Sequence, residues 1–180
     1  LSTVDGFDSD ADLYFDGTND RIIYTNGAFQ DLTNKSFTIE AVILKGASGQ
    51  RTFFGHGDGE GTQRSIHFRV YDDGSLRFDF FANNVTDYTA NLQLNTYYYV
   101  AATYDLGTDL TTLYLNGQSI GQNNSGPYIG VHANTTTTIG SWTTTEFWVG
   151  KVPLLKTYDR ALSSAEVQNN FNGIKSRFGI

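Results

Sequence analysis

The sequence lacks cysteine and methionine and has very little proline. Its 180 residues contain no Cys, no Met and only 2 Pro, but 19 Gly. The absence of cysteine excludes a disulfide framework, and with it the small, disulfide-stapled class of secreted domain. Because the chain begins at Leu1 and has no methionine, we expect it to be part of a longer or processed polypeptide. We expect residues 1–180 to form one domain, since all-β sandwiches commonly reach this size as a single unit.

Positive charge and long apolar runs are also scarce. Lys and Arg total 12 against 19 Asp and Glu, which gives a net charge of −7 and an isoelectric point near 4.7. An acidic chain offers no field that attracts nucleic acid or an anionic membrane surface, so neither is an expected partner. No apolar run reaches the roughly 18 residues that a membrane span needs, so we expect no membrane insertion.

The sequence is rich in aromatic residues, and its strand patterns are clearest in the middle of the chain. It contains 13 Phe and 11 Tyr. Tyr97–Tyr104 is aromatic, β-branched and uncharged, which predicts a strand covered on both faces. Leu110–Leu115 predicts the next strand. Asn116 and Gly117 then supply the two positive-φ residues of a type I′ turn, and Gln118–Gly121 returns along the partner strand. We place this hairpin at the centre of an antiparallel sheet.

A second hairpin is predicted over Ser65–Phe81, with its turn at Asp72–Ser75. Strand alternation divides its side chains between two faces. The apolar face is expected to lie in the core and consists of Ile66, Phe68, Val70, Leu76, Phe78 and Phe80. The opposite face is expected to point outward and to be free for binding; it consists of His67, Arg69, Tyr71, Arg77, Asp79 and Phe81.

Shorter elements complete the prediction. Further strands are expected at Leu13–Phe15 continuing into Arg21–Tyr24, and at Ser36–Leu44, Thr52–Phe54, Tyr88–Leu94, Thr135–Ile139 and Phe147–Thr157. Pro153 inside the last of these argues for an edge strand or a bulge. Ser163-Ser-Ala-Glu166 is a capping box that predicts a short helix over Ser164–Phe171. Residues 1–12 are expected to be a polar leader and Asn172–Ile180 a polar tail.

Four segments that span nearly the whole chain carry a combination of motifs. They are LYFDGTND at Leu13–Asp20, SFTIEA at Ser36–Ala41, the central hairpin with its LYLNG, and YDRALS at Tyr158–Ser163. Together they resemble laminin G-like domains of the concanavalin A-like jelly-roll superfamily. The resemblance implies an all-β, two-sheet antiparallel jelly-roll sandwich with one short C-terminal helix. The closing segment resembles the end of such domains in bacteriophage and bacterial surface proteins, which implies an extracellular setting on a virion or cell surface.

The sequence lacks the groups that hydrolysis would need. A glycan hydrolase of this superfamily would carry two carboxylates on one strand, in a pattern resembling Glu-x-Asp-x-x-Glu. No glutamate has an acidic neighbour at that spacing, whether Glu40, Glu60, Glu146 or Glu166. There is also no Gly-x-Ser-x-Gly elbow and no catalytic cysteine to work with a histidine. We therefore expect a protein that is not an enzyme.

One turn has the composition of a calcium site. Asp16, Asn19 and Asp20 lie close together, and such oxygen-rich turns suit Ca²⁺ as a cofactor. The alternative is that these side chains simply hydrogen-bond their own turn. In similar domains an Asp or Asn in the closing strand helps to complete the site, but Gly150–Leu155 has no oxygen-bearing side chain.

Ligand binding would depend on aromatic rings beside hydrogen-bonding groups, as in sugar-binding sites. Three places qualify: the outer face of the second hairpin, with Arg69, Tyr71, Arg77, Asp79 and Phe81; a loop with Tyr128 and His132; and a threonine-rich loop with Trp142. The function expected is extracellular recognition or adhesion, with a glycan as ligand. The alternative is a structural assembly module, such as a capsid decoration, fibre or tail subunit, that contacts neighbouring protein subunits and forms a homo-oligomer or larger assembly.

Overall fold

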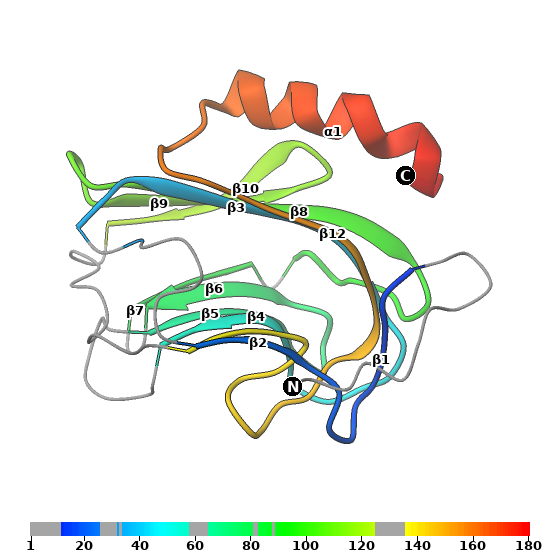
Figure 1. Cartoon of the computed structure of the whole chain (residues 1–180). Helices are drawn as coiled ribbons and strands as arrows, with labels where there is room; N and C mark the ends of the chain where they lie inside the picture. The colour runs from blue at the N-terminus through cyan, green and yellow to red at the C-terminus, as the bar shows by residue number, and fades with distance from the viewer. Residues whose placement is uncertain are drawn as a thin grey trace.

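Two β-sheets and one helix make up the fold. The computed structural model describes residues 12–25, 32, 34–57, 65–80, 83–87, 89–124 and 136–180. Within them, two six-stranded sheets lie face to face, and helix α1 (Ser164–Phe178) crosses the outer side of the first sheet (Figure 1). The strand pairings are antiparallel throughout. The predicted all-β jelly roll with a C-terminal helix is confirmed.

The first sheet carries the central hairpin of the chain. In spatial order its strands are β1 (Tyr14–Asp16), β12 (Val149–Tyr158), β3 (Phe37–Lys45), β8 (Tyr97–Asp105), β9 (Leu110–Leu115) and β10 (Gln118–Asn123). Asn116 and Gly117 have φ values of 47° and 79°, as the predicted type I′ turn requires. Strand β8 pairs with β3 on one side and β9 on the other and is internal, as predicted. Strand β10 lies at the edge of the sheet, so the prediction that the β9–β10 hairpin lies at the centre was wrong.

The second sheet holds the other predicted hairpin. In spatial order its strands are β2 (Ile22–Tyr24), β11 (Thr137–Ile139), β4 (Arg51–His56), β5 (Ile66–Val70), β6 (Leu76–Phe80) and β7 (Asn83–Asp87). Two predictions were wrong here. Strand β2 does not continue β1 but belongs to the opposite sheet, and the strand expected at Tyr88–Leu94 lies earlier, as β7. The position of β7 places Val85, a buried residue, opposite Phe78.

Aromatic side chains fill the space between the sheets. The predicted apolar face of the β5–β6 hairpin is fully in this core. Phe68 and Phe78 meet edge to face at 5.3 Å between ring centroids, and Phe53 packs against Phe68 at 4.6 Å and against Trp148 at 5.4 Å. Such tilted and edge-to-face contacts add to the free energy gained by burying large rings. This core fixes which side of each strand is left for function.

Helix α1 covers a second, smaller cluster on the outer face of the first sheet. Its capping box is present as predicted, with the Glu166 amide donating to Ser163 Oγ and the Ser163 amide to the Glu166 carboxylate. The helix does not end at Phe171, however, but continues to Phe178 and stops at Gly179 in the left-handed conformation. The segment predicted to be a polar tail is therefore mostly helical. Ile174 and Phe178 pack on the cluster, so tertiary packing outweighs the low helix propensity of the asparagine-rich sequence.

A carboxylate lies buried beneath this helix. Glu40 on β3 accepts hydrogen bonds from Tyr99 Oη at 2.6 Å, Tyr158 Oη at 3.2 Å and Asn170 Nδ2 at 2.8 Å. Burial and the neighbouring carboxylate raise the pKa of Tyr99, so its hydroxyl remains a proton donor. The three donors satisfy the charge that the sheet buries and tie α1 to β3, β8 and β12.

Strand β12 bends at the predicted proline. Its register with β3 shifts between Lys151 and Leu154, which is the bulge that Pro153 indicated. The strand is internal, between β1 and β3, so of the two alternatives the bulge is correct and the edge position is not. No helix in the described parts of the chain has the length and apolar character to cross a bilayer.

Candidate ligand-binding site

The outer face of the second sheet carries the polar side chains of the β5–β6 hairpin. Alternation places them opposite the core, as predicted, but the prediction that this face is open was wrong at its centre. His67, Arg69 and Asp79 are only 2–8% exposed. Across the two strands His67 pairs with Asp79, and Arg69 lies directly opposite Arg77. Two like charges in such positions repel each other, so the face requires a compensating acid.

Asp79 supplies that acid and organises an ion network. Its carboxylate accepts from Arg69 Nη2 at 2.9 Å and lies 3.1 Å from Arg77 Nε and 3.0 Å from His67 Nδ1. Burial by itself lowers the pKa of Arg69, but the carboxylates of Asp79 and Glu146 outweigh it and raise that pKa overall. The buried arginine therefore remains a cation whose charge is neutralised within the network.

A segment from far along the chain covers this network. Residues 141–147 fold onto the outer face, and Glu146 binds Arg69 at 3.2 Å, Gln50 Nε2 at 2.6 Å and Thr52 Oγ1 at 2.6 Å. The Glu146 carbonyl also accepts from the Thr52 amide at 3.0 Å. Its φ of 50° is rare for a residue with a side chain, which indicates that these contacts hold the backbone in a strained conformation.

Trp142 sits on this segment in a tight hairpin. Trp142 and Thr145 exchange backbone hydrogen bonds of 3.0 and 2.8 Å, and Thr143 between them has a φ of 48°, which is strained for a β-branched residue. The half-buried indole lies over Gly55, where a Cβ would come within 2.9 Å of the ring. Its centroid is 3.9 Å from that of His67. Trp142 is therefore fixed on the sheet, with part of its surface open to solvent.

Tyr71 is less available than predicted. The guanidinium groups of Arg69 and Arg77 lie 5.6 and 5.5 Å from its ring centroid, and Arg77 Nη1 donates to its hydroxyl at 2.5 Å. The ring therefore covers the arginine pair. Of the other predicted ligand-binding residues, Phe81, Tyr128 and His132 lie outside the described residues.

Beside the Trp142 hairpin is a hollow of about 410 Å³ that sequence reasoning missed. Its lining is mostly threonine and consists of Arg21, Ile23, Thr25, Gly57, Thr136, Thr138, Thr143 and Thr144. Arg21 donates to the Thr143 carbonyl and lies 5.8 Å from the Phe147 ring centroid. The signal available in the sequence was the threonine run in residues 135–145, but nothing local showed that β2 would lie beside it.

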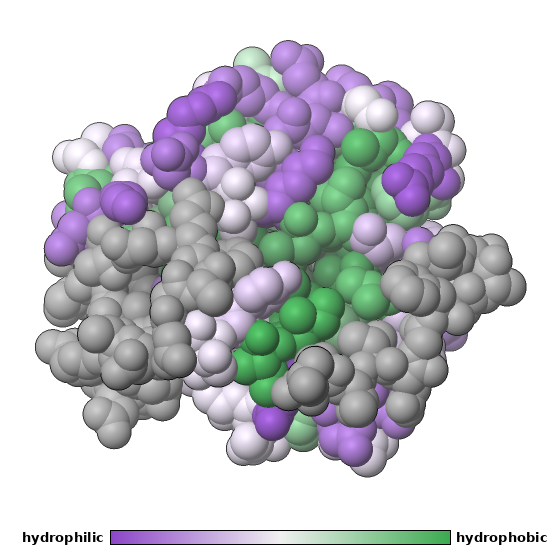
Figure 2. All heavy atoms as spheres, in the orientation of Figure 1, coloured by the Kyte–Doolittle hydropathy of each residue, from purple (hydrophilic) through white to green (hydrophobic). Residues whose placement is uncertain are grey.

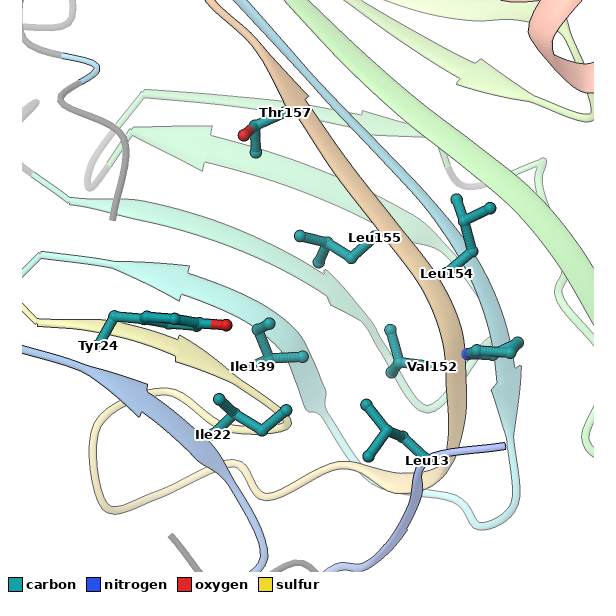
Figure 3. Close-up of a pocket in the computed structure, with 9 residues that line it drawn as sticks. Leu13, Ile22, Tyr24, Ile139, Val152, Leu154, Leu155 and Thr157 are labelled. Atoms are coloured by element: carbon teal, nitrogen blue, oxygen red, sulfur yellow. The ribbon is translucent and has the colours of Figure 1, made fainter. Parts of the chain in front are cut away.

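A second hollow is apolar. It is a groove of about 290 Å³ on the open side of the sandwich, where Val152 and Leu155 of β12 face Ile22 of β2 and Ile139 of β11 (Figure 3). Figure 2 shows hydrophobic surface gathered along this side, between the two sheets. The described residues that line the groove carry no charge, so it suits an apolar partner better than a sugar.

The predicted calcium turn uses its carboxylates on its own backbone. Asp20 is buried and its Oδ2 accepts from the Asp16 amide at 2.9 Å, while Asp16 Oδ1 accepts from the Thr18 amide at 2.7 Å. Asn19 is exposed. No three His, Cys, Asp or Glu side chains in the described residues are grouped to hold a metal ion. The contacts agree with the alternative that these groups stabilise their turn.

Comparison with known proteins places the fold. Residues 16–168 match the family model of the concanavalin A-like lectin/glucanases superfamily. No curated protein matches the sequence. Among solved structures, the CBM40 of Ruminococcus gnavus IT-sialidase, bound to α2,3-sialyllactose, is similar with a TM-score of 0.69 at 16% identity, covering 89% of this chain and 92% of that one.

Two further structures have the same fold. The heptameric SAP-like pentraxin of Limulus polyphemus matches with a TM-score of 0.64 at 19% identity, covering 86% of this chain and 78% of that one. The leech intramolecular trans-sialidase matches with a TM-score of 0.67 at 16% identity, covering 83% of this chain but only 26% of the enzyme. At these identities the likeness concerns the fold.

Proposed function

The chain belongs to the concanavalin A-like lectin/glucanases superfamily, and from that membership we propose that it is a non-catalytic carbohydrate-binding module. The observation that carries the proposal is the threonine-lined hollow beside Trp142 on the outer face of the second sheet. The CBM40 of Ruminococcus gnavus, which has a similar fold, is a binding module with α2,3-sialyllactose bound.

The chemistry of the hollow suits sugar hydroxyl groups. Each threonine hydroxyl both donates and accepts, and Arg21 adds several N–H donors in a planar group. The partly exposed indole of Trp142 offers a flat apolar surface next to them. Because the strained hairpin and the Arg69–Glu146 contact already fix this surface, a ligand would order few side chains on binding, which favours affinity.

Arg21 points to the class of glycan. It is the charged residue among those that line the hollow, so a sugar with a carboxylate would gain an ion pair there. The glycans proposed therefore include sialylated ones, as in the Ruminococcus gnavus neighbour.

Four carboxylates of the described residues have structural partners, which fits a binding role. Asp79 and Glu146 both accept from Arg69, Glu166 caps helix α1, and Glu40 lies beneath that helix. Glycoside hydrolysis requires two carboxyl groups that flank a sugar bond in an open cleft. The setting that fits a binding module of this family is extracellular, on a virion or cell surface.

A second function, structural assembly, is favoured by a different observation. Tyr24 is exposed on β2 and lines the apolar groove of Figure 3, together with Ile22 and Leu155. An apolar surface of this kind suits a neighbouring protein subunit. The proposal in that case is a virion or fibre subunit that forms oligomers through this side.

A glycan array separates the two functions. We expect selective binding that Trp142→Ala and Thr144→Ala weaken and that Thr96→Ala, an exposed threonine away from the hollow, leaves unchanged. Arg21→Gln should weaken binding of acidic glycans more than that of neutral ones. An array without binding, together with concentration-dependent association in sedimentation, would contradict the carbohydrate proposal and support assembly.

A further inference from the structure

Lys45 occupies a position where the strand pattern would place a core residue. On β3, Phe37, Ile39, Ala41 and Ile43 alternate into the space between the sheets, and Lys45 is the next residue in that series. It is only 3% exposed. Its side chain leaves the first sheet and crosses to the second, where Nζ donates to the Tyr71 carbonyl at 2.6 Å, at the turn between β5 and β6.

A buried ammonium at this place is costly unless its donors are used. Burial lowers the pKa of Lys45, and the nearby carboxylates of Asp72 and Asp73 act in the opposite direction. An ammonium group has three N–H donors. Among the described residues its hydrogen-bond acceptor is the Tyr71 carbonyl. A Met or Leu would fill the end of the core without this cost, so we expect the buried ammonium group to have a function other than packing.

The ammonium lies at a pocket of about 180 Å³ at the end of the sandwich. Its lining comes from three separate segments and consists of Lys45, Ser48, Asp72, Asp73, Gly74 and residues 91–94. The walls are braced by backbone hydrogen bonds, from the Leu92 amide to Gly74 O at 2.9 Å and from the Asn95 amide to Lys45 O at 2.7 Å. Gly74 has a φ of 78°, and a Cβ there would be 2.6 Å from the Leu92 nitrogen, so the close approach of two walls requires glycine.

The charges of this pocket define the ligand that it can take. Asp72 and Asp73 outnumber Lys45, so an anion would be repelled. A sugar hydroxyl, in contrast, can accept from the ammonium and donate to a carboxylate at the same time. Gln93 and Ser48 add groups of both kinds, and Leu94 is exposed at the rim, where it can contact the C–H face of a sugar ring.

We propose that the Lys45 pocket is a second binding site of this protein, which takes adjacent hydroxyl groups of an uncharged sugar. It lies at the end of the sandwich, and its lining shares no residue with the threonine-lined hollow. The site does not depend on the function proposed for that hollow. With both sites active, one domain would hold a branched or repeating glycan at two points, which raises its apparent affinity without new contacts.

The variants are chosen so that folding and binding can be told apart. Lys45→Met keeps the length of the buried stem and removes the ammonium. Gln93→Ala changes an exposed side chain whose carboxamide group donates to Asn91 in the same segment. Asp72→Asn removes the charge but keeps an oxygen that can accept from the Gly49 amide. Gln118→Ala, which removes an exposed amide that contacts Gln168, is the matched control outside the pocket.

The test is an NMR titration with methyl α-mannoside, methyl β-glucoside and methyl β-galactoside, and with glucuronate as the anionic comparison. We expect at least one uncharged glycoside to shift the Gly74 and Gln93 amide signals saturably. Lys45→Met and Gln93→Ala should each weaken this binding about tenfold or more, through loss of one ligand hydrogen bond, with Gln118→Ala unchanged. If Lys45→Met fails to fold, glycoside binding by Gln93→Ala and Asp72→Asn decides whether the pocket is the binding site.

The proposal would be overturned by the absence of a saturable shift with any uncharged glycoside, by shifts of equal affinity in the pocket variants and the wild type, or by a preference for glucuronate. Shifts confined to the Trp142 indole signal would also overturn it while supporting the proposed function. Shifts confined to the pocket would support the second binding site and would count against sugar binding beside Trp142.

Discussion

Replacing Arg69 with Met tests whether the buried ion network holds the Trp142 hairpin on the second sheet. Arg69 joins Asp79 at 2.9 Å to Glu146 at 3.2 Å. After its loss Asp79 keeps Arg77, but among the described residues Glu146 keeps only the neutral donors of Gln50 and Thr52. Removing one partner of a buried ion pair costs roughly 3–5 kcal/mol. Because the Glu146 side chain is 22% exposed, we expect the lower end, about 3 kcal/mol.

A second substitution shows whether the loss of stability comes from the Glu146 carboxylate, which Arg69→Met leaves without its cationic partner. Glu146→Gln keeps an oxygen for Gln50 and Thr52 but removes the charge, and by itself should cost about 1.5–3 kcal/mol through the lost charged hydrogen bond. Combined with Arg69→Met it should cost less than the sum, with a coupling of about 1–2 kcal/mol. Urea unfolding gives these free energies, provided that the slope m stays constant. Near-UV circular dichroism reports whether Trp142 leaves its position.

Arg160→Met is the matched control. Arg160 and Glu166 lie closer together, at 2.6 Å, than Arg69 and either of its partners, but their side chains are 56% and 40% exposed. Solvent screens such a pair, so this variant should unfold almost as the wild type does. If Arg69→Met costs less than about 1 kcal/mol and the cycle is additive, the network does not hold the hairpin and the reasoning is refuted.

Three further predictions concern stability. Phe68→Ala should lower the free energy of unfolding in urea by about 3–5 kcal/mol, because it opens a cavity in the core. Tyr71→Ala should lower it by about 1–3 kcal/mol, because it removes only the arginine contacts. Equal losses would contradict this assignment of the two faces. If the Asp20 turn binds calcium, Ca²⁺ should raise the melting temperature relative to EDTA and Asp20→Ala should abolish the difference, whereas equal melting curves would leave it as a turn. Hydrogen bonds from Arg160, and then from Ser163, lower the pKa of Glu166 from 4.5 to about 2. The stabilising effect of Glu166, which is small because solvent screens this exposed group, is therefore complete above pH 4.5 and is lost as the pH falls toward 2. Glu166→Gln should therefore flatten the pH dependence of unfolding in that window, and an unchanged profile would contradict it.

Local features of the fold were predictable from the sequence. The turn at Asn116 and Gly117 and the capping box at Ser163 are decided by residues within a few positions of each other, and both are present. The two faces of the β5–β6 hairpin were assigned correctly because side chains alternate strictly along a strand. The end of helix α1 was not predictable, because it depends on how Ile174 and Phe178 pack against the first sheet.

The candidate site was less predictable, because it is built from segments far apart in the sequence. The strand pattern predicts that Arg69 faces outward and is exposed. In the structure Glu146, which is distant in the chain, covers it. Trp142 was identified as a candidate because it is an aromatic residue in a threonine-rich segment, but its position over Gly55 and His67 follows from tertiary packing. Lys45 lies one residue beyond the strand predicted over Ser36–Leu44, and only the pairing of β3 with its neighbours shows that it points between the sheets.

The central claim is that sugars bind on the outer face of the second sheet, beside Trp142. The most direct test uses the 2 tryptophans of the chain as probe and reference, since Trp142 is partly exposed and Trp148 is buried in the core. In an NMR titration with α2,3-sialyllactose and with the glycans selected on the array, we predict a saturable shift of the Trp142 indole N–H signal and none of the Trp148 signal. A stationary Trp142 signal, or equal shifts of both, would contradict the account.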